Sequence, residues 1–233
     1  MLNALFVHRR LQGTKLLPKG NELDTTVNSA DPSLELLGSW DIILAKDYRP
    51  IFEPAIPILN ELRKWPDLCQ RVLRGLIECA DNFGPSLSEM GWDHAGPLYH
   101  SVLGSAKSDG AFYTHNISAL ILARLAVHDD MADWTKPKKI SNLRIMDPAC
   151  GTGTLLMAVL RELKRRAKKA DSRANLEALH KNLVENSLAG LDINRQATQL
   201  AASNLTISSE NVDYEKMNIY TMKHGVQVAS GEP

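Results

Sequence analysis

The stretch Leu143–Leu156, with the sequence LRIMDPACGTGTLL, constrains the fold of this chain more than any other. A short apolar run ends in the acid Asp147, a Pro-Ala-Cys-Gly-Thr-Gly turn follows over residues 148–153, and an apolar, helix-forming run comes next. Strand, glycine turn and helix in this order let a backbone approach a nucleotide-like ligand closely. The glycines permit positive φ, and the helix N-terminus directs unpaired N–H groups into the same space. The sequence therefore predicts an α/β fold with a ligand site at this turn.

A second short strand that ends in an acid follows the turn. After the first helix, a more polar helix is predicted over residues 171–187, and Leu188–Ile193 then reads as an apolar strand. Asp192 lies near the end of that strand, and Asn194 suits the cap of the next helix. In nucleotide-binding α/β folds such an acid binds ribose hydroxyls, because a carboxylate offers only hydrogen-bond acceptors. A third strand is predicted over residues 212–220.

The residues before the glycine turn predict a separate helical region. A polar loop at residues 105–110 is taken as the boundary, so the predicted domains are residues 1–105 and residues 106–233. Residues 1–39 are weakly patterned, with interspersed glycine and proline, and are interpreted as a loop-rich arm.

Helical periodicity begins at about Trp40 and continues to about Asp81. One apolar stripe is expected to face the core: Leu68, Val72, Leu73, Leu76, Ile77 and Ala80. Residues 83–91 are rich in glycine, proline and serine and predict a break, with a further short helix over residues 92–104.

The segment Gly110–Thr114, GAFYT, is the second informative stretch. Thr114 is expected to cap a helix whose apolar face consists of Ile117, Leu120, Ile121, Leu125 and Val127. Phe112 and Tyr113, just before a helix N-terminus, are placed to stack on or wall a small ligand. On periodicity alone, a hydrophobic staple that fixes the entry of a core helix explains them at least as well.

Composition narrows the class of protein. With 44% hydrophobic and 23% charged residues, the chain is typical of soluble globular proteins, and no apolar run approaches the roughly 20 residues of a membrane span. The N-terminus has the wrong order of basic and apolar residues for a secretory signal, so a cytoplasmic location without membrane attachment is predicted. Three cysteines without ligand spacing support neither a disulfide framework nor a metal site. The formal net charge of zero gives no global attraction to nucleic acid.

The helix after the glycine turn is expected to run to about Lys169 and to end in a basic cluster. Its members are Arg161, Lys164, Arg165, Arg166, Lys168 and Lys169. Cations near a helix C-terminus complement its dipole, which accounts for much of the cluster structurally. Contact with phosphates is the alternative.

Three motifs, in this order, resemble one family. GAFYT (Gly110–Thr114), DPACGTGTLL (Asp147–Leu156) and LDIN (Leu191–Asn194) are similar to the motifs of N6-adenine DNA methyltransferases. The pattern is most similar to modification subunits of type I restriction systems and to fused restriction-modification enzymes. The resemblance implies a Rossmann-like domain that uses S-adenosylmethionine, preceded by a helical N-terminal domain. It also implies DNA as the substrate and a specificity or restriction subunit as a partner.

The same resemblance implies a set of cofactor-binding residues: Phe112, Tyr113, Thr114, Asp147, Ala149, Gly151, Thr152, Gly153, Asp192, Ile193 and Asn218. The aromatic motif would contact the methionine part of S-adenosylmethionine, and the glycine turn with its preceding acid would lie along the amino acid and sulfonium. Asp192 would hold the ribose hydroxyls, and Asn218 or Ile219, near the end of the third strand, would lie at the adenine edge.

Two departures from the family pattern bear on activity. His115 stands where the family has a proline after F-Y-T. The catalytic motif Asn/Asp-Pro-Pro-Tyr/Phe, which holds a flipped adenine, has no counterpart, since no Pro-Pro pair occurs in the 233 residues. No catalytic residue is assigned, and the chain alone is expected to hold the methyl donor with little or no catalysis.

The missing motif has a consequence for the fold. Only the first three of the family's seven strands are expected, which leaves the strand before the glycine turn with an unpaired, apolar edge. The chain is therefore interpreted as a fragment, either a cloned piece or the front part of a split gene, whose C-terminal half is a candidate partner.

Two other functions stay open on the sequence. One is a methyltransferase for RNA or for protein glutamine, although GAFYT after a helical region favours DNA. The other is a non-catalytic scaffold subunit that binds S-adenosylmethionine and completes its sheet with a partner chain.

Overall fold

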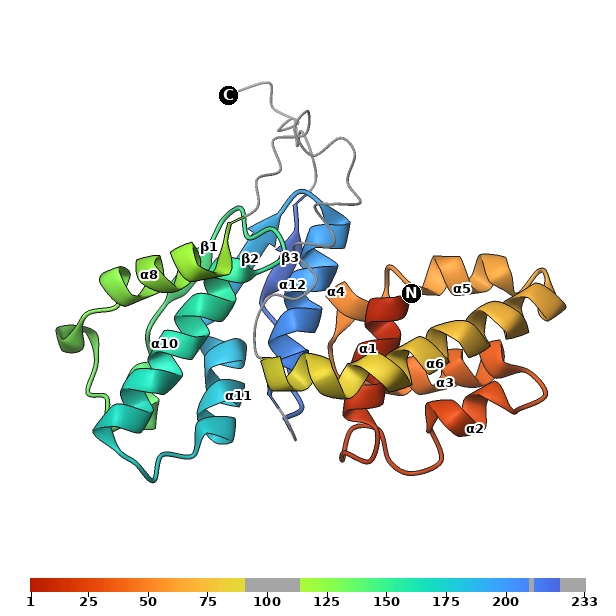
Figure 1. The fold of residues 1–233 in the computed structure, drawn as a ribbon, viewed down its shortest axis with the longest axis horizontal. Helices are drawn as coiled ribbons and strands as arrows, with labels where there is room; N and C mark the ends of the chain where they lie inside the picture. The colour runs from red at the N-terminus through yellow and green to blue at the C-terminus, as the bar shows by residue number, and fades with distance from the viewer. Residues whose placement is uncertain (91–113, 210–211, 223–233) are drawn as a thin grey trace, which may run out of the picture.

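The computed structural model describes residues 1–90, 114–209 and 212–222, with the backbone alone for residues 83–90 (Figure 1). Phe112 and Tyr113 lie outside the described residues, as do the short helix predicted over residues 92–104 and the predicted domain boundary. The chain is rich in helices and contains a small parallel sheet, which agrees with the predicted α/β combination.

Residues 1–39 form helices and not the predicted loop-rich arm. The structure contains α1 (Leu2–Leu11), α2 (Leu23–Val27) and the start of α3 (Pro32–Leu44) in this segment. The buried residues of α1 follow a helical spacing: Ala4, Leu5, Val7, His8 and Leu11. This helical spacing is present in the sequence, but the glycine and proline residues between such short helices obscured it. These residues belong to the core.

The helical region predicted from about Trp40 is confirmed, but it extends further than expected. It continues with α4 (Arg49–Phe52), α5 (Ile56–Leu62) and α6 (Pro66–Met90). The break predicted at residue 83 is wrong, because α6 passes through Gly84 and Pro85; local propensity is a weak prior that context overrides. In the predicted stripe of α6, Leu73, Ile77 and Ala80 are buried, whereas Leu68 is exposed.

The second part of the chain alternates helices with three strands. Its elements are α8 (Asn116–Ala126), η1 (Asp129–Met131), α9 (Pro137–Ser141), β1 (Ile145–Asp147), α10 (Thr154–Ala170), α11 (Leu176–Asn186), β2 (Leu188–Asp192), α12 (Arg195–Ile207) and β3 (Ile219–Thr221). The strands are parallel in the order β1-β2-β3, with Met146 paired to Ala189 and Leu191 to Tyr220. Among the described strands β1 lies at an edge, as predicted.

The two faces of the sheet differ in their surroundings. On one face Gly190 lies close to α10 and β3: a Cβ there would come within 2.9 Å of Leu156 Cδ1 and 2.8 Å of Ile219 Cδ1. On the other face Met146 and Tyr220 are more than half exposed. Parallel sheets are ordinarily covered on both faces, so this second face is an unusual surface for a parallel sheet.

The third strand is shorter than predicted and starts later, at Ile219. The residues before it donate their backbone N–H groups to side chains from other parts of the chain. Tyr214 N donates to Tyr48 Oη at 2.8 Å, and Met217 N donates to Asp47 Oδ2 at 2.7 Å. Because these two N–H groups have partners outside the sheet, residues 214–217 do not extend the strand.

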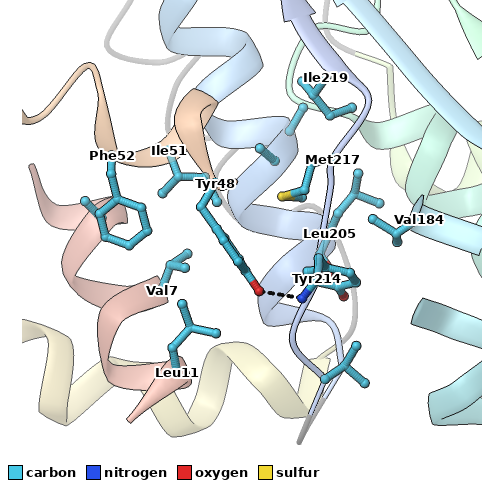
Figure 2. Close-up of a cluster of buried hydrophobic side chains, with 14 of the residues drawn as sticks. Val7, Leu11, Tyr48, Ile51, Phe52, Val184, Leu205, Tyr214, Met217 and Ile219 are labelled. Atoms are coloured by element: carbon cyan, nitrogen blue, oxygen red, sulfur yellow. Dashed lines mark hydrogen bonds between the residues drawn. The ribbon is translucent and has the colours of Figure 1, made fainter. Parts of the chain in front are cut away.

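One apolar core joins the N-terminal helices to the sheet region. In Figure 2, Tyr48 lies between side chains of the two parts, with Val7, Leu11 and Phe52 on one side and Leu205, Met217 and Ile219 on the other. Gln199, buried on α12, donates from Nε2 to the carbonyl oxygen of Ile51 at 2.7 Å. The same core therefore supports α1, α4, α12 and β3.

Two buried histidines should make the fold sensitive to acid. Burial, above all, lowers the pKa of His8 to about 4 and that of His180 to about 3. The unfolded chain takes up these protons near pH 6.5 whereas the folded chain does not, so stability present above that pH is lost as pH falls toward 4 and 3. Each histidine contributes a slope of about 1.4 kcal/mol per pH unit.

We expect the free energy of unfolding, measured with urea, to decrease as the pH is lowered from 7 to 4.5. In His180→Gln the slope should be smaller by about one proton, or roughly 1.4 kcal/mol per pH unit. An identical slope in the wild type and the variant would contradict a neutral, buried His180.

Candidate functional site

The site forms at the carboxyl ends of β1 and β2, around the turn that joins β1 to α10. Gly151 and Gly153 both have positive φ, +52° and +86°, which L side chains rarely adopt. A Cβ on Gly151 would meet no atom of the described residues within 4 Å, so these residues leave the space beside it open. A Cβ on Gly153 would lie 3.1 Å from Cα and Cβ of Ala201, so glycine here permits close packing on α12. The two glycines thus have different roles.

Asp192 links the end of β2 to the glycine turn. Its Oδ2 accepts a hydrogen bond from Gly151 N at 2.8 Å, and its Oδ1 accepts one from Asn194 N at 2.8 Å. Asn194 in turn caps α12, as predicted, by accepting from Gln196 N and Ala197 N. Each carboxylate oxygen keeps a second lone pair. Asp192 is therefore oriented by the backbone and can still accept hydrogen bonds from a ligand.

Asp147 lies at the end of the neighbouring strand. Its Oδ1 accepts from Ala149 N at 3.1 Å. Burial raises the pKa of Asp147, the hydrogen bond from Ala149 opposes that rise, and the negative charge of Asp192 adds to it. The two neighbouring strand ends thus bring two carboxyl groups to one turn, where they favour a positively charged or hydroxyl-bearing ligand.

Cys150, inside the turn, is a packing residue. It is buried, its N–H donates to Leu191 O at 2.8 Å, and its Sγ lies 3.1 Å from the position of a Cβ on Gly190. Burial, followed by the charges of Asp192 and Asp147, raises the pKa of the thiol to about 12. A protonated thiol is a poor nucleophile, so this environment disfavours nucleophilic chemistry at Cys150.

The structure adds residues that position the turn and that the sequence analysis did not identify. Asn204, on α12, donates from Nδ2 to the backbone oxygen of Thr152 at 3.0 Å. Met222, just after β3, donates its N–H to Asp192 O at 2.7 Å. No local sequence pattern marks either residue, since each acts across a tertiary contact. Thr152 itself is buried.

The helix that follows GAFYT differs from its prediction in cap and in orientation. His115, and not Thr114, is the N-cap: its Nδ1 accepts from Ile117 N at 3.3 Å. The predicted apolar face is confirmed only in part: Val127 is buried and Leu120 packs against the core, whereas Ile117 is 61% and Leu125 is 67% exposed. Within α8 the buried side chains are Ala119 and Ala123, which lie against Ala158 of α10. Small side chains let two helices approach closely, and this contact outweighs the larger apolar residues.

The remaining predicted site residues fall in two places. Ile193 follows Asp192 directly and is half exposed, so it borders the site. Asn218 lies elsewhere: it precedes β3, and its Nδ2 donates to Glu185 O at 3.0 Å and to Leu188 O at 3.3 Å. The placement of Asn218 near the end of the third strand was therefore wrong. It caps carbonyls at the amino end of the sheet, opposite the glycine turn.

Neither a metal centre nor a membrane helix is found in the part of the chain that the structure describes. Within residues 1–90, 114–209 and 212–222, no three His, Cys, Asp or Glu residues are grouped so that they could hold an ion. Within those ranges no helix combines the length and the apolar character needed to cross a bilayer.

Comparison with known proteins identifies the family. No curated protein sequence matches this chain. A family model described as N-6 DNA Methylase matches residues 96–225, which is more than half of the chain. The matched residues include the glycine turn, Asp147 and Asp192. The chain belongs to the N6-adenine DNA methyltransferase family.

Proposed function

We propose that this chain binds S-adenosylmethionine and provides the methyl donor for methylation of adenine N6 in DNA, within a restriction-modification system. One observation carries the proposal. The hydrogen bond from Gly151 N to Asp192 Oδ2 brings the acid of the second strand onto the glycine turn of the first. This arrangement suits a nucleoside whose ribose hydroxyls need acceptors and whose substituent lies along a backbone turn.

The chemistry of the residues fits the cofactor. Among the residues that the structure describes, the space beside Gly151 leaves room for a ligand next to the turn. The free lone pairs of Asp192 accept the two ribose hydroxyls, and the exposed side chain of Ile193 offers an apolar wall to the adenine ring. Asp147, with the turn, lies along the amino acid and the sulfonium, whose positive charge it attracts. When bound, the cofactor supplies a methyl group activated by a positively charged sulfur.

The acceptor side of the reaction is proposed to come from residues outside these 233. No Pro-Pro pair is present to hold an exocyclic amine. The edge of β1 and the exposed face at Met146 and Tyr220 support a partner that completes the sheet. We propose that this partner, with a specificity subunit, reads the DNA, and that this chain alone binds the donor without transferring the methyl group.

Titration of the cofactor into the wild type and Asp192→Asn tests the proposal. The amide keeps the shape of the carboxylate but loses its charge and one acceptor oxygen. Since hydrogen bonds to a charged group contribute about 1.5–3 kcal/mol, the Kd for S-adenosylmethionine should rise roughly tenfold to a hundredfold. Isothermal titration calorimetry measures the change, and Asp213→Asn, near Lys181 and outside the site, is the matched control.

Two results would contradict the proposal. Equal affinity in the wild type and Asp192→Asn, or no affinity in either, would remove the assignment of the cofactor site. Robust methyl transfer to DNA by this chain alone would show that the acceptor site lies within it.

A further inference from the structure

The segment of residues 136–173 is much more basic than the rest of the chain. It contains eleven Lys and Arg residues against three Asp and Glu residues, whereas the whole chain carries 27 of each kind. The remaining residues therefore have an excess of negative charge. A local excess of positive charge on a chain that is neutral overall marks a surface that attracts anions.

Cations from two helices of this segment gather at the end of the sheet region opposite the glycine turn. Helix α10 begins at that turn and runs for 17 residues, so its last residue lies about 25 Å from it (Figure 1). Helix α9 lies at the amino end of the sheet, where Ser141 O accepts a hydrogen bond from Ser187 Oγ at 2.8 Å. The residues that lead into α9 are held against α10, because the ring centre of Trp134 lies 5.3 Å from the guanidinium of Arg166.

Part of this positive charge is neutralised inside the fold. Glu162, whose side chain is only 2% exposed, accepts two hydrogen bonds from Arg165, both at 2.7 Å, and one from Arg166 at 2.8 Å. Arg124 reaches the same carboxylate from α8, and Arg166 also forms an ion pair with Asp129. These arginines therefore hold α10 to its neighbours.

Four further cations at this end are exposed and have no carboxylate partner in the part of the chain that the structure describes: Lys138, Lys139, Lys169 and Arg173. The helix dipole does not account for them. A helix C-terminus carries only about half a negative charge, and at the end of α10 Lys168 already donates to Ser172 O. Four positive charges therefore face solvent on one surface, which we call the basic end.

The side chains around these cations favour DNA over an anionic membrane. Residues 136–144 and 161–173, all of which the structure describes, expose no large apolar side chain. Binding to a membrane surface combines cations with apolar side chains that enter the bilayer. A DNA duplex requires spaced cations alone, since one phosphate charge recurs about every 1.7 Å along its axis. The family to which the chain belongs acts on DNA.

We infer that the basic end, formed by Lys138, Lys139, Lys169 and Arg173, binds the phosphate backbone of DNA. Contacts of this kind hold the duplex and carry no sequence information. The inference goes beyond the proposed function, in which a partner reads the DNA and this chain binds the methyl donor. The basic end and the cofactor site lie at opposite ends of α10, so each can be tested without the other.

Fluorescence anisotropy of a labelled DNA duplex of arbitrary sequence, titrated with the full chain at several salt concentrations, tests the inference. The logarithm of the association constant falls with the logarithm of salt concentration, with a slope of about −0.9 per phosphate contact. Replacement of all four basic-end residues by Gln should therefore make the slope shallower by about 3–4 and raise the Kd at low salt at least tenfold. All four side chains are exposed, so the melting temperature should be unchanged.

Paired variants provide the control for net charge. Lys138→Gln with Lys139→Gln should make the slope shallower by about two. Arg71→Gln with Arg74→Gln removes the same charge from exposed positions on α6 and should leave the slope unchanged. Equal changes in the two pairs would overturn the inference, as would a wild type without salt-dependent DNA binding.

Vesicles that contain phosphatidylserine distinguish the membrane alternative. Tighter binding of the wild type to these vesicles than to the duplex would overturn the inference, and weaker binding would support it. Titration of S-adenosylmethionine is a separate measurement. A wild type that binds DNA through the basic end but does not bind the cofactor would overturn the proposed function alone.

Discussion

A variant that begins at residue 91 should lose cooperative folding and cofactor binding, even though it retains the whole sheet. Without α1 and α4, the side chains of Leu205, Met217 and Ile219 lose the partners that bury them. Each fully buried side chain of this size contributes about 1.5–3 kcal/mol, and a domain is stable by only about 5–15 kcal/mol. Exposure of these three side chains therefore costs about 4.5–9 kcal/mol, which is comparable with the whole stability of a domain. Urea unfolding followed by circular dichroism measures the result.

A milder variant of the full chain tests the same contact between the N-terminal helices and the sheet region. Tyr48→Phe keeps the ring but leaves the N–H of Tyr214 without its acceptor. It should lower the free energy of unfolding by about 1–3 kcal/mol and preserve a single transition. A cooperative transition in the variant that begins at residue 91, with cofactor binding intact, would instead support two domains that fold independently.

The second large effect is expected for Gly153→Ala. The residue has φ of +86°, so an L side chain would be strained by about 1–2 kcal/mol. Its Cβ would also lie 3.1 Å from the backbone and side chain of Ala201, and overpacking of this kind costs about 1–3 kcal/mol. Both effects act at the N-cap of α10, inside the cofactor site. We expect a lower melting temperature and a loss of S-adenosylmethionine affinity.

Gly13→Ala separates strain from packing. Gly13 has φ of +74°, and a Cβ on it would meet no atom of the described part of the chain within 4 Å, so backbone strain is the effect expected in this variant. It should be destabilised less than Gly153→Ala and should bind the cofactor normally. Equal melting temperatures for the two variants would mean that the contact with Ala201 does not constrain residue 153.

Features that depend on local sequence were predicted well. The glycine turn, the acid at the end of β2 and the Asn194 cap all follow from a few adjacent residues, and the structure contains each of them. The ion pairs around Glu162 could not be predicted in this way. Arg165 and Arg166 are near neighbours in sequence, but Arg124 and Asp129 come from a different segment.

The errors in the prediction have tertiary causes. The third strand was predicted to begin too early. The residues just before it, Tyr214 and Met217, hydrogen-bond to Tyr48 and Asp47, which lie more than a hundred residues away in the chain. The buried face of α8 was misjudged because alanines carry little weight in an apolar pattern, although close helix packing favours them. Asn218 was placed by analogy with a strand end, and its amide instead donates to carbonyls in the last turn of α11 and at the start of β2. Residue-by-residue roles in the cofactor site remain predictions.

The hydrogen bonds from residues 214 and 217 to Tyr48 and Asp47 also set an order of events during synthesis. The N-terminal helices leave the ribosome first, but the surface around Tyr48 gains its permanent cover only after Met217 has emerged. Contacts of such long sequence separation form late and slowly. Until then, an apolar surface on the nascent chain is open to chaperones and to neighbouring chains.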